Sequence, residues 1–372
     1  MYIHERKDWP DFFWETREVV NLLSEARHMQ GRLIGKMESM GFELRDEALM
    51  ETITLDVLKS AEIEGELYHP DAVRSSIASR LGLEYAGTPK TDRHIDGMVE
   101  MLIDATQNCF EPLTKERLFG WHAALFPTGR SGISKIVVAD WRKDQNGKMQ
   151  VVSGRIGKEK VHFEAPDATL VEMEMESFLH WYNDENSLDL VLKAAIAHLW
   201  FVTIHPFQDG NGRIARALTD MLLARADKST QRFYSMSAQI RVDRSKYYNI
   251  LEKTQKGGLD VTEWVIWFLV CLINSLMSTN QLLVHVLAKS DFWSQHAHIG
   301  LNDRQKKILH HLLNGFEGNL TSMKWAKITK CSKDTAVRDI NDLVMKKILQ
   351  KQEAGGRSTS YELILHAEKF VG

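Results

Sequence analysis

The residues best suited to chemistry lie in one run of twelve, His205 to Arg216, with the sequence HPFQDGNGRIAR. An imidazole has an ordinary pKa of about 6.5 and can take a proton near neutral pH, so His205 is the candidate general base. Asp209 offers a hard carboxylate oxygen of the kind that Mg²⁺ takes together with waters and phosphates. The run therefore combines a candidate base with a candidate metal ligand.

The same run is suited to binding phosphate. Gly210 and Gly212 allow a tight backbone whose N–H groups can turn toward an anion. The segment Arg213–Ala226 has apolar residues on one helical face, so the loop would lie at a helix N-terminus. Arg213 and Arg216 would be neighbours on the first turn, where two guanidinium groups can grip a polyphosphate. These residue types predict transfer of a phosphate-containing group to a hydroxyl.

Each residue of the run also has an ordinary structural interpretation: a loop histidine, an Asn-Gly turn, solvated helix arginines. Taken together, however, the twelve residues resemble the signature of the Fic family, HPFx[D/E]GNGRxxR, at every fixed position. The resemblance implies a mainly α fold, a Fic helical bundle with a small β-hairpin flap. It also implies transfer of AMP from ATP to a Ser, Thr or Tyr hydroxyl of a protein, with release of pyrophosphate.

The family's roles carry over to this sequence by position. The resemblance implies that His205 deprotonates the target hydroxyl and that Asp209 holds Mg²⁺. It also implies a set of nucleotide-binding residues, in which Phe207 anchors the loop. The α- and β-phosphates would be bound by Gly210, Asn211 and Gly212, and the β/γ end by Arg213 and Arg216. A Lys at position 212 would mark relatives that transfer phosphate, and this chain has Gly there.

A second resemblance lies upstream, in the segment 55–66 (LDVLKSAEIEGE). Ser60 and Glu64 are four residues apart and share a helix face, and Gly65 is placed to end the helix. The segment resembles the family's inhibitory motif, [S/T]xxxE[G/N], although an ordinary solvated helix end has the same pattern. The resemblance implies that Glu64 pairs with Arg216, occupies the room of the ATP γ-phosphate and inhibits transfer. In some relatives this glutamate also serves removal of AMP from the target.

The segment Val151–Pro166 contains two short extended runs separated by glycines and charged residues, which predicts a β-hairpin. The family has a flap at this place, which docks the target by adding a strand. Val161, His162 and Phe163 are therefore candidates for contact with a target segment. The alternative is an edge strand that covers the core.

Whole-chain composition narrows the class of protein. The chain has 372 residues, a net charge of −3 and three widely spaced cysteines, which suggests two or three domains in a reducing, cytoplasmic compartment. The N-terminal sequence does not have the pattern of a secretory signal. The longest apolar run, Trp264–Met277, is shorter than the roughly 20 residues of a membrane span, so we expect a core helix and no membrane.

Two further patterns predict helices around the motif. The segment Thr16–Met40 has helical periodicity and follows an aromatic cluster, which resembles the N-terminal helical extension of longer Fic proteins and indicates a docked terminus. The segment Leu188–Thr203 is apolar almost all round, as expected of a buried helix before the catalytic loop. The predicted domains are residues 1–48 (helical extension), 49–290 (Fic domain) and 291–372.

The last of these domains differs in charge: residues 301–372 have 13 Lys+Arg and 8 Asp+Glu, or +5. Helices at Asn302–Asn314, Met323–Thr329 and Lys333–Lys346, then strands at Ile348–Gln352 and Ser360–Leu365, predict a winged helix-turn-helix. Within the third helix, five residues would face inward: Ala336, Val337, Ile340, Leu343 and Val344. If the domain binds DNA, the residues facing it would be Lys333, Thr335, Arg338 and Arg357. A protein-docking module is the alternative.

Two classes of function are therefore expected. The first is an autoinhibited transferase whose partners are ATP and a protein hydroxyl, on another protein or on the chain itself, with a homodimer as a further candidate. Another nucleotide or a phosphocholine donor is the alternative within this class, since the motif grips phosphates and does not select the base. The second class is a nucleotide-sensing, DNA-binding transcription regulator.

Overall fold

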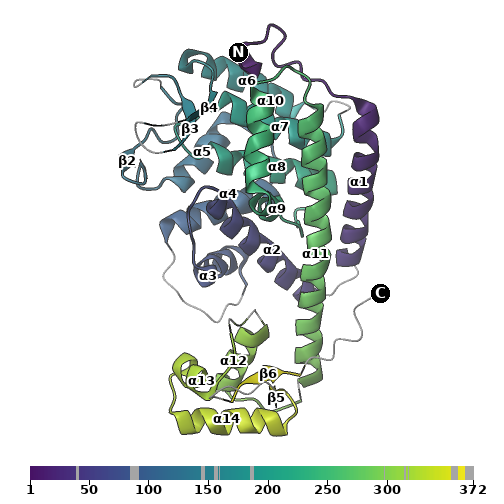
Figure 1. The fold of residues 1–372 in the computed structure, drawn as a ribbon, viewed down its shortest axis with the longest axis vertical. Coiled ribbons are helices and arrows are strands. Elements are labelled where there is room, and N and C mark those ends of the chain that lie inside the picture. The colour runs from purple at the N-terminus through teal and green to yellow at the C-terminus, as the bar shows by residue number, and fades with distance from the viewer. Residues whose placement is uncertain are drawn as a thin grey trace. The chain divides into compact units, whose positions relative to one another are not determined.

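The computed structural model describes residues 1–38, 42–83, 92–143, 147–154, 158, 160–184, 188–296, 298–313, 316, 318–352 and 359–364. The chain divides into two compact units, Met1–Gln281 and Leu282–Gly372. Figure 1 shows the helices and strands of both units. The predicted domain boundaries at residues 48 and 290 stay predictions.

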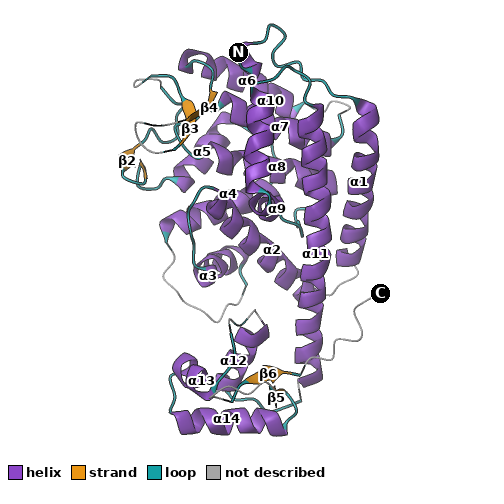
Figure 2. Ribbon diagram, in the orientation of Figure 1, coloured by secondary structure: helices purple, strands orange, loops and turns teal. Residues whose placement is uncertain are grey.

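The first unit is built almost wholly of helices (Figure 2). In chain order they are α1 (Thr16–Glu38), α2 (Phe42–Ile63), α3 (Pro70–Leu81), α4 (Arg93–Gln107), α5 (Lys115–Leu125), α6 (Val171–Asn183), α7 (Leu190–Ile204), α8 (Asn211–Asp227), α9 (Met236–Val242), α10 (Arg244–Gln255) and the first part of α11 (Thr262–His296). Two antiparallel strand pairs accompany them, β1 (Arg130–Ser131) with β2 (Ser134–Lys135) and β3 (Gln150–Ser153) with β4 (Lys160–Glu164). The mainly α fold and the predicted hairpin are confirmed.

Helices α7 and α8 form the centre of this unit. Every residue of α7 from Val191 to Ile204 is buried, as its nearly uniform apolar sequence predicts. Helix α8 packs along α7, and the predicted catalytic loop is the turn between them. Because both helices are enclosed by the rest of the unit, the loop rests on a rigid support.

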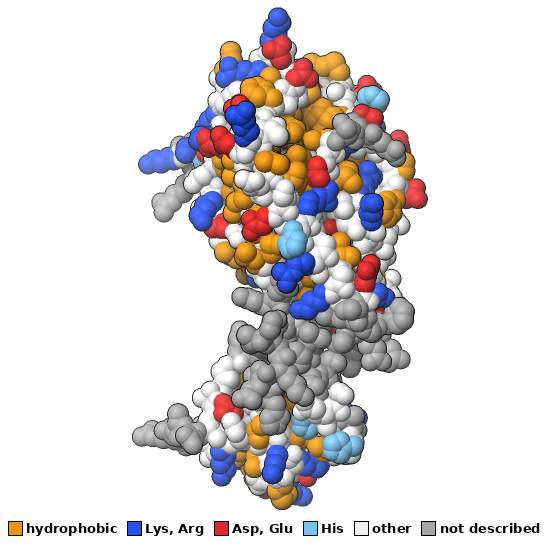
Figure 3. Space-filling model, turned by 90° about the vertical axis from the view of Figure 1, so that its right-hand side faces the viewer, with side chains coloured by type: hydrophobic (Ala, Val, Ile, Leu, Met, Phe, Trp, Pro, Cys, Tyr) orange, Lys and Arg blue, Asp and Glu red, His pale blue; other side chains and the backbone are white. Residues whose placement is uncertain are grey.

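Helix α11 lies against this centre, where the Trp264 Nε1–H donates to the Ala195 carbonyl at 2.8 Å. The part of this helix from Thr262 to Thr279 is long and apolar enough to cross a membrane, but the core helices of soluble proteins can have the same length and composition. Of that part, 61% is buried inside the fold, which supports the predicted core helix. Helix α11 also exposes Val270 and Met277, and Figure 3 shows hydrophobic side chains gathered over one face of the molecule.

The N-terminal segment is docked, as predicted. The backbone of Phe13 exchanges hydrogen bonds with Leu259 and Val261, and the Arg6 guanidinium donates to the Gly257 carbonyl. The α1 helix follows and buries Val19 among other residues of its apolar stripe. The segment thereby covers the turn between α10 and α11.

In the second unit, beyond the end of α11, the described residues form three helices and a strand pair at the predicted places. They are α12 (Asp303–Leu313), α13 (Ser322–Thr329), α14 (Lys333–Met345), β5 (Leu349–Lys351) and β6 (Tyr361–Leu363), the strands pairing antiparallel. Trp325 is fully buried in this unit's own core. The predicted inward position of Val337 is wrong: it is 37% exposed, because the buried stripe of α14 runs through Ala336, Ile340 and Leu343.

The winged helix assignment itself stays a prediction. Lys333 and Arg338 are exposed on α14, and Thr335 is partly exposed and hydrogen-bonded to Ser332 at the helix start. Arg357 and the turn around it lie outside the described residues.

A pair of helical glycines tests the packing of the first unit. A Cβ added to Gly97 in α4 would lie 1.8 Å from the Ala124 carbonyl oxygen of α5, whereas one added to Gly120 would meet nothing within 4 Å. We expect Gly97→Ala to lower the free energy of unfolding by about 2 kcal/mol or more, because backbone must move. Gly120→Ala should raise it by ~0.5 kcal/mol through helix propensity. Urea denaturation of both variants checks this, and equal effects would contradict the close α4–α5 packing.

Candidate active site

His205 ends α7 in a left-handed backbone conformation, with φ 52°. Its Nδ1 lies 3.2 Å from the Val202 carbonyl oxygen, so Nδ1–H donates there and Nε2 is left as the unprotonated nitrogen. Burial of the ring lowers the His205 pKa to about 4, against a smaller raising effect of the Val202 hydrogen bond. The imidazole is therefore neutral at pH 7, with a free lone pair on Nε2 as a base requires.

Arg142 fixes the backbone of this loop from a distant part of the chain. Its Nε donates to the His205 carbonyl at 2.8 Å, and its backbone N–H donates to the Pro206 carbonyl at 2.8 Å. The guanidinium also donates to the carbonyl of Pro166, directly after the hairpin. Arg142 is buried and was missed in the sequence, which holds no signal that links it to a loop 63 residues away.

Phe207 and Asn211 lock the loop from within. Phe207 is fully buried and stacks on the His122 ring, with centroids 4.2 Å apart, so it anchors the loop as predicted. The Asn211 amide accepts from the Phe207 N–H at 2.9 Å and donates to the Phe207 carbonyl at 2.8 Å. This side chain therefore closes the loop, and the backbone N–H of Asn211 remains for the predicted phosphate contact.

Gly210 and Gly212 leave room at the start of α8. Gly210 has φ 85°, and a Cβ on it would come within 2.9 Å of Phe126. A Cβ on Gly212 would come within 2.4 Å of Glu64 Oε1. The N-cap residue is Gly210, which has no side chain to cap the helix, so the first N–H groups of α8 suit an anion.

Asp209 is held in place yet partly open. One carboxylate oxygen accepts from the Gly210 N–H at 2.6 Å and the other from the Ser131 hydroxyl at 2.5 Å. The side chain is 40% exposed, which leaves lone pairs for a cation. Within the described ranges no group of three or more acidic, His or Cys residues could hold a metal ion. Asp209 therefore fits Mg²⁺ as a single protein ligand, with waters and phosphates as the other ligands of the ion.

His122 supports the backbone of Asp209. Its Nε2 lies 3.2 Å from the Asp209 carbonyl and its Nδ1 accepts from the Ala139 N–H at 3.2 Å, which fixes the neutral tautomer. Burial lowers the His122 pKa to about 4. Neither His122 nor Ser131 was predicted, because their partners lie 87 and 78 residues away.

The predicted inhibitory residues meet the second arginine. Arg216 is buried; its Nε donates to the Ser60 hydroxyl at 2.8 Å and its Nη2 to Glu64 Oε1 at 2.8 Å. Nη2 also donates to the Ser60 carbonyl at 3.1 Å, whereas the buried Nη1 has no hydrogen-bond partner. Gly65, with φ 86°, turns the chain after α2. The predicted contact between Glu64 and Arg216 is thus present.

Arg213, the first arginine, is bound by Glu66, a residue that was not predicted from the sequence. Arg213 Nη1 donates to Glu66 Oε1 at 3.2 Å, and its guanidinium lies over the Phe126 ring at 4.9 Å. The other oxygen of Glu66 accepts from the Tyr68 hydroxyl at 2.6 Å. Glu64 and Glu66 thus take one arginine each, a pairing that the Glu-Gly-Glu spacing could have suggested.

Comparison with known proteins agrees with this geometry. The sequence model of the Fic/DOC family matches residues 112–223, which include the loop. The chain is 42% identical over 87 residues to "Protein adenylyltransferase Fic" of Drosophila virilis, and 31% identical over 101 residues to "Probable protein adenylyltransferase aq_aa38" of Aquifex aeolicus. This chain contains a Fic domain.

The matches to the two relatives cover 23% and 27% of this chain and only 17% and 29% of those proteins. In the solved structure of a Fic family protein from Desulfovibrio desulfuricans G20, 97% of that chain superimposes on 95% of this one, with a TM-score of 0.54 at 20% identity. This likeness confirms the Fic fold. A domain of unknown function, DUF4172, matches residues 2–83, a range that contains Ser60 and Glu64.

The three candidate residues of the flap, Val161, His162 and Phe163, differ in their surroundings. Strands β3 and β4 pair Val152 with Val161, and Val161 is 37% exposed. Phe163 is a correction: its side chain is buried against the rings of Tyr2 and His4, because it points to the core face of β4, and it offers no contact to a target. His162 lies between Ser153 and Glu252.

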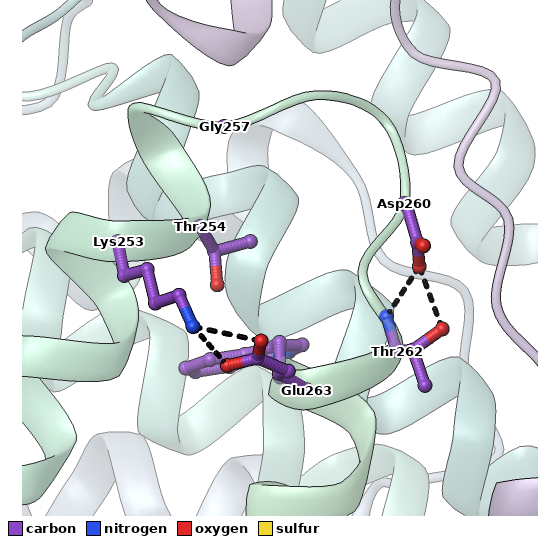
Figure 4. A pocket seen from close by; sticks show the side chains of 7 residues that line it. Lys253, Thr254, Gly257, Asp260, Thr262 and Glu263 are labelled. Atoms are coloured by element: carbon purple, nitrogen blue, oxygen red, sulfur yellow. Dashed lines mark hydrogen bonds and ion pairs between the residues drawn. The ribbon is translucent and has the colours of Figure 1, made fainter.

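A separate cavity of about 160 Å³ lies at the turn between α10 and α11 (Figure 4). Its polar side chains satisfy one another: Lys253 pairs with Glu263, and the Asp260 carboxylate accepts from Thr262. The lining includes none of the predicted site residues. The cavity is therefore not part of the candidate active site.

The buried imidazole of His122 gives a pH test. Its folded pKa of about 4 lies below the unfolded value of 6.5, so its contribution to stability is full above pH 6.5 and is lost as the pH falls toward 4. We expect the destabilisation by His122→Gln to be smaller at pH 5 than at pH 7 by roughly 2 kcal/mol. Phe126→Leu, which changes a neighbouring ring without a titratable group, should cause equal destabilisation at both pH values. Chemical denaturation measures both, and a His122→Gln effect independent of pH would contradict the buried neutral ring.

Proposed function

We propose that this Fic-domain protein is a protein adenylyltransferase, which moves AMP from ATP to a Ser, Thr or Tyr hydroxyl of a target protein. The observation that carries the proposal is His205: a neutral imidazole with Nε2 free, held beside the open N-terminus of α8. The names of the partial relatives support the same reaction. The donor and the target are part of the proposal, since the match to these relatives is short.

Each group has a role in this reaction. His205 Nε2 takes the proton of the target hydroxyl while the oxygen attacks the α-phosphorus and pyrophosphate leaves. The first N–H groups of α8 bind phosphate oxygens, and Arg213 and Arg216 hold the β/γ end. Mg²⁺ held by Asp209 would neutralise phosphate charge. Arg142 and Asn211 keep the loop in one conformation, so little reorganisation precedes the chemical step.

The protein as described is in an inhibited state under this proposal. Arg216 cannot grip a phosphate in the usual two-pronged way while Ser60 and Glu64 occupy its Nε and Nη2. Glu64 also lies so close to Gly212 that a phosphate at the helix start would meet its negative charge. ATP would then bind without its γ-phosphate in the productive place.

Removal of this carboxylate tests both the function and the inhibition. We expect Glu64→Gly to raise label transfer from α-labelled ATP to proteins of a cell extract by about tenfold or more, the equivalent of ~1.4 kcal/mol in the barrier. Glu62→Gly is the matched control, because Glu62 pairs with Lys59 and Arg241 and not with α8. Unchanged or lower transfer by Glu64→Gly, or equal activation by both variants, would contradict the proposed inhibition.

Glu66 provides a second test at the first arginine. In the Glu64→Gly background, Glu66→Gln should lower the KM for ATP by a few-fold, because Arg213 no longer has to exchange a carboxylate for a phosphate. Steady-state kinetics measures this change. A higher KM would mean that Glu66 orients Arg213 for the nucleotide instead of competing with it.

A further inference from the structure

A chain of three side chains joins the flap to α10. The Ser153 hydroxyl on β3 lies 2.6 Å from Nε2 of His162 on β4, and Nδ1 of the same ring lies 2.5 Å from a carboxylate oxygen of Glu252 on α10. Strand β4 packs against α10 (Figure 1). Both ring nitrogens are therefore occupied, one by a hydroxyl and the other by a carboxylate.

This order of groups defines the direction of proton transfer. The carboxylate of Glu252 is kept ionised by Lys256 at 2.6 Å, which together with His162 lowers the Glu252 pKa to about 2. An ionised carboxylate can only accept, so His162 Nδ1–H donates to it and Nε2 is left to accept from Ser153. A serine, a histidine and an acid in this sequence are the arrangement that activates a nucleophilic hydroxyl.

The hydroxyl is accessible, and contacts join both its hairpin and α10 to the nucleotide-transfer loop. Ser153 is exposed on the flap. The base of the hairpin is tied to the His205 carbonyl through Arg142, which also donates to Pro166. On α10, one helical turn beyond Glu252, Gln255 lies against Val202 and Thr203, next to the carbonyl that orients His205.

We propose that Ser153 is a nucleophilic hydroxyl activated by His162 and Glu252, and that it accepts AMP when the enzyme modifies its own chain. The acceptor role rests on the proposed function. The Ser153 oxygen attacks the α-phosphorus of ATP and forms the Oγ–P bond, while the bond from that phosphorus to the bridging oxygen breaks and pyrophosphate leaves with the electron pair. The proton passes to His162 Nε2, and Glu252 stabilises the imidazolium. His205 serves hydroxyls of other proteins.

Peptide mapping after labelling tests the acceptor. In the Glu64→Gly protein incubated with ATP and Mg²⁺, we expect AMP on the peptide that contains Ser153. Ser153→Ala should remove this self-label, and His162→Gln should lower it by about a hundredfold, the usual worth of a general base. Ser229→Ala, whose hydroxyl bonds only to the backbone of Gln231, is the matched control and should leave it unchanged. AMP on another residue with Ser153 unmodified, or a full label in His162→Gln, would overturn the proposal.

A fluorophosphonate probe tests the nucleophile without ATP. In the His205→Ala protein we expect the probe to label Ser153, and the label to fall sharply in His162→Gln, which a merely structural histidine would not cause. Labelled Ser153 in a protein that transfers AMP to nothing would place the failure in the proposed function. An enzyme that labels extract proteins, but neither reacts with the probe nor carries AMP at Ser153, would overturn this inference alone.

Discussion

The closed loop between α7 and α8 is the constraint on which the rest of this site depends. The loop must turn sharply at His205, and buried residues satisfy its backbone polar groups. The Asn211 side chain bonds to the backbone of Phe207, the Arg142 side chain donates to the His205 carbonyl, and the Arg142 backbone N–H donates to the Pro206 carbonyl. Because buried backbone groups are costly to leave unpaired, these contacts favour one loop conformation. That conformation places the free Nε2 of His205 beside the N-terminus of α8.

The two buried arginines show what the proposed inhibition would rest on. A buried guanidinium needs a partner, and removing one partner of a buried pair leaves an expensive charge. In the described state Glu64 and Glu66 supply that partner for Arg216 and Arg213, each with a carboxylate in place of a phosphate. Under the proposed function, the segment that contains Glu64 and Glu66 would imitate the charge of the nucleotide. Inhibition and nucleotide binding would then be alternatives for the same guanidinium groups.

The sequence predicted the parts of this site that are local and missed those that are distant. Periodicity and motif spacing act over a few residues. They therefore predicted the signature run, the buried helix before it, the hairpin and the Ser60–Glu64 spacing. Arg142, His122 and Ser131 contact the loop from 63 to 87 residues upstream, and no local pattern marks them. Phe163 was misplaced because strand alternation does not tell which face meets the core. The sequence also did not show that the Asn211 side chain bonds to the backbone of Phe207.

The most direct test of the central claim compares the position of the label in ATP. The Glu64→Gly protein would be incubated with Mg²⁺ and cell extract, once with α-labelled and once with γ-labelled ATP, beside the Glu64→Gly/His205→Ala protein. The account predicts that extract proteins take the α label and not the γ label, and that this transfer is lost when His205 is replaced. Transfer of the γ label, or α-label transfer to extract proteins that persists without His205, would contradict it.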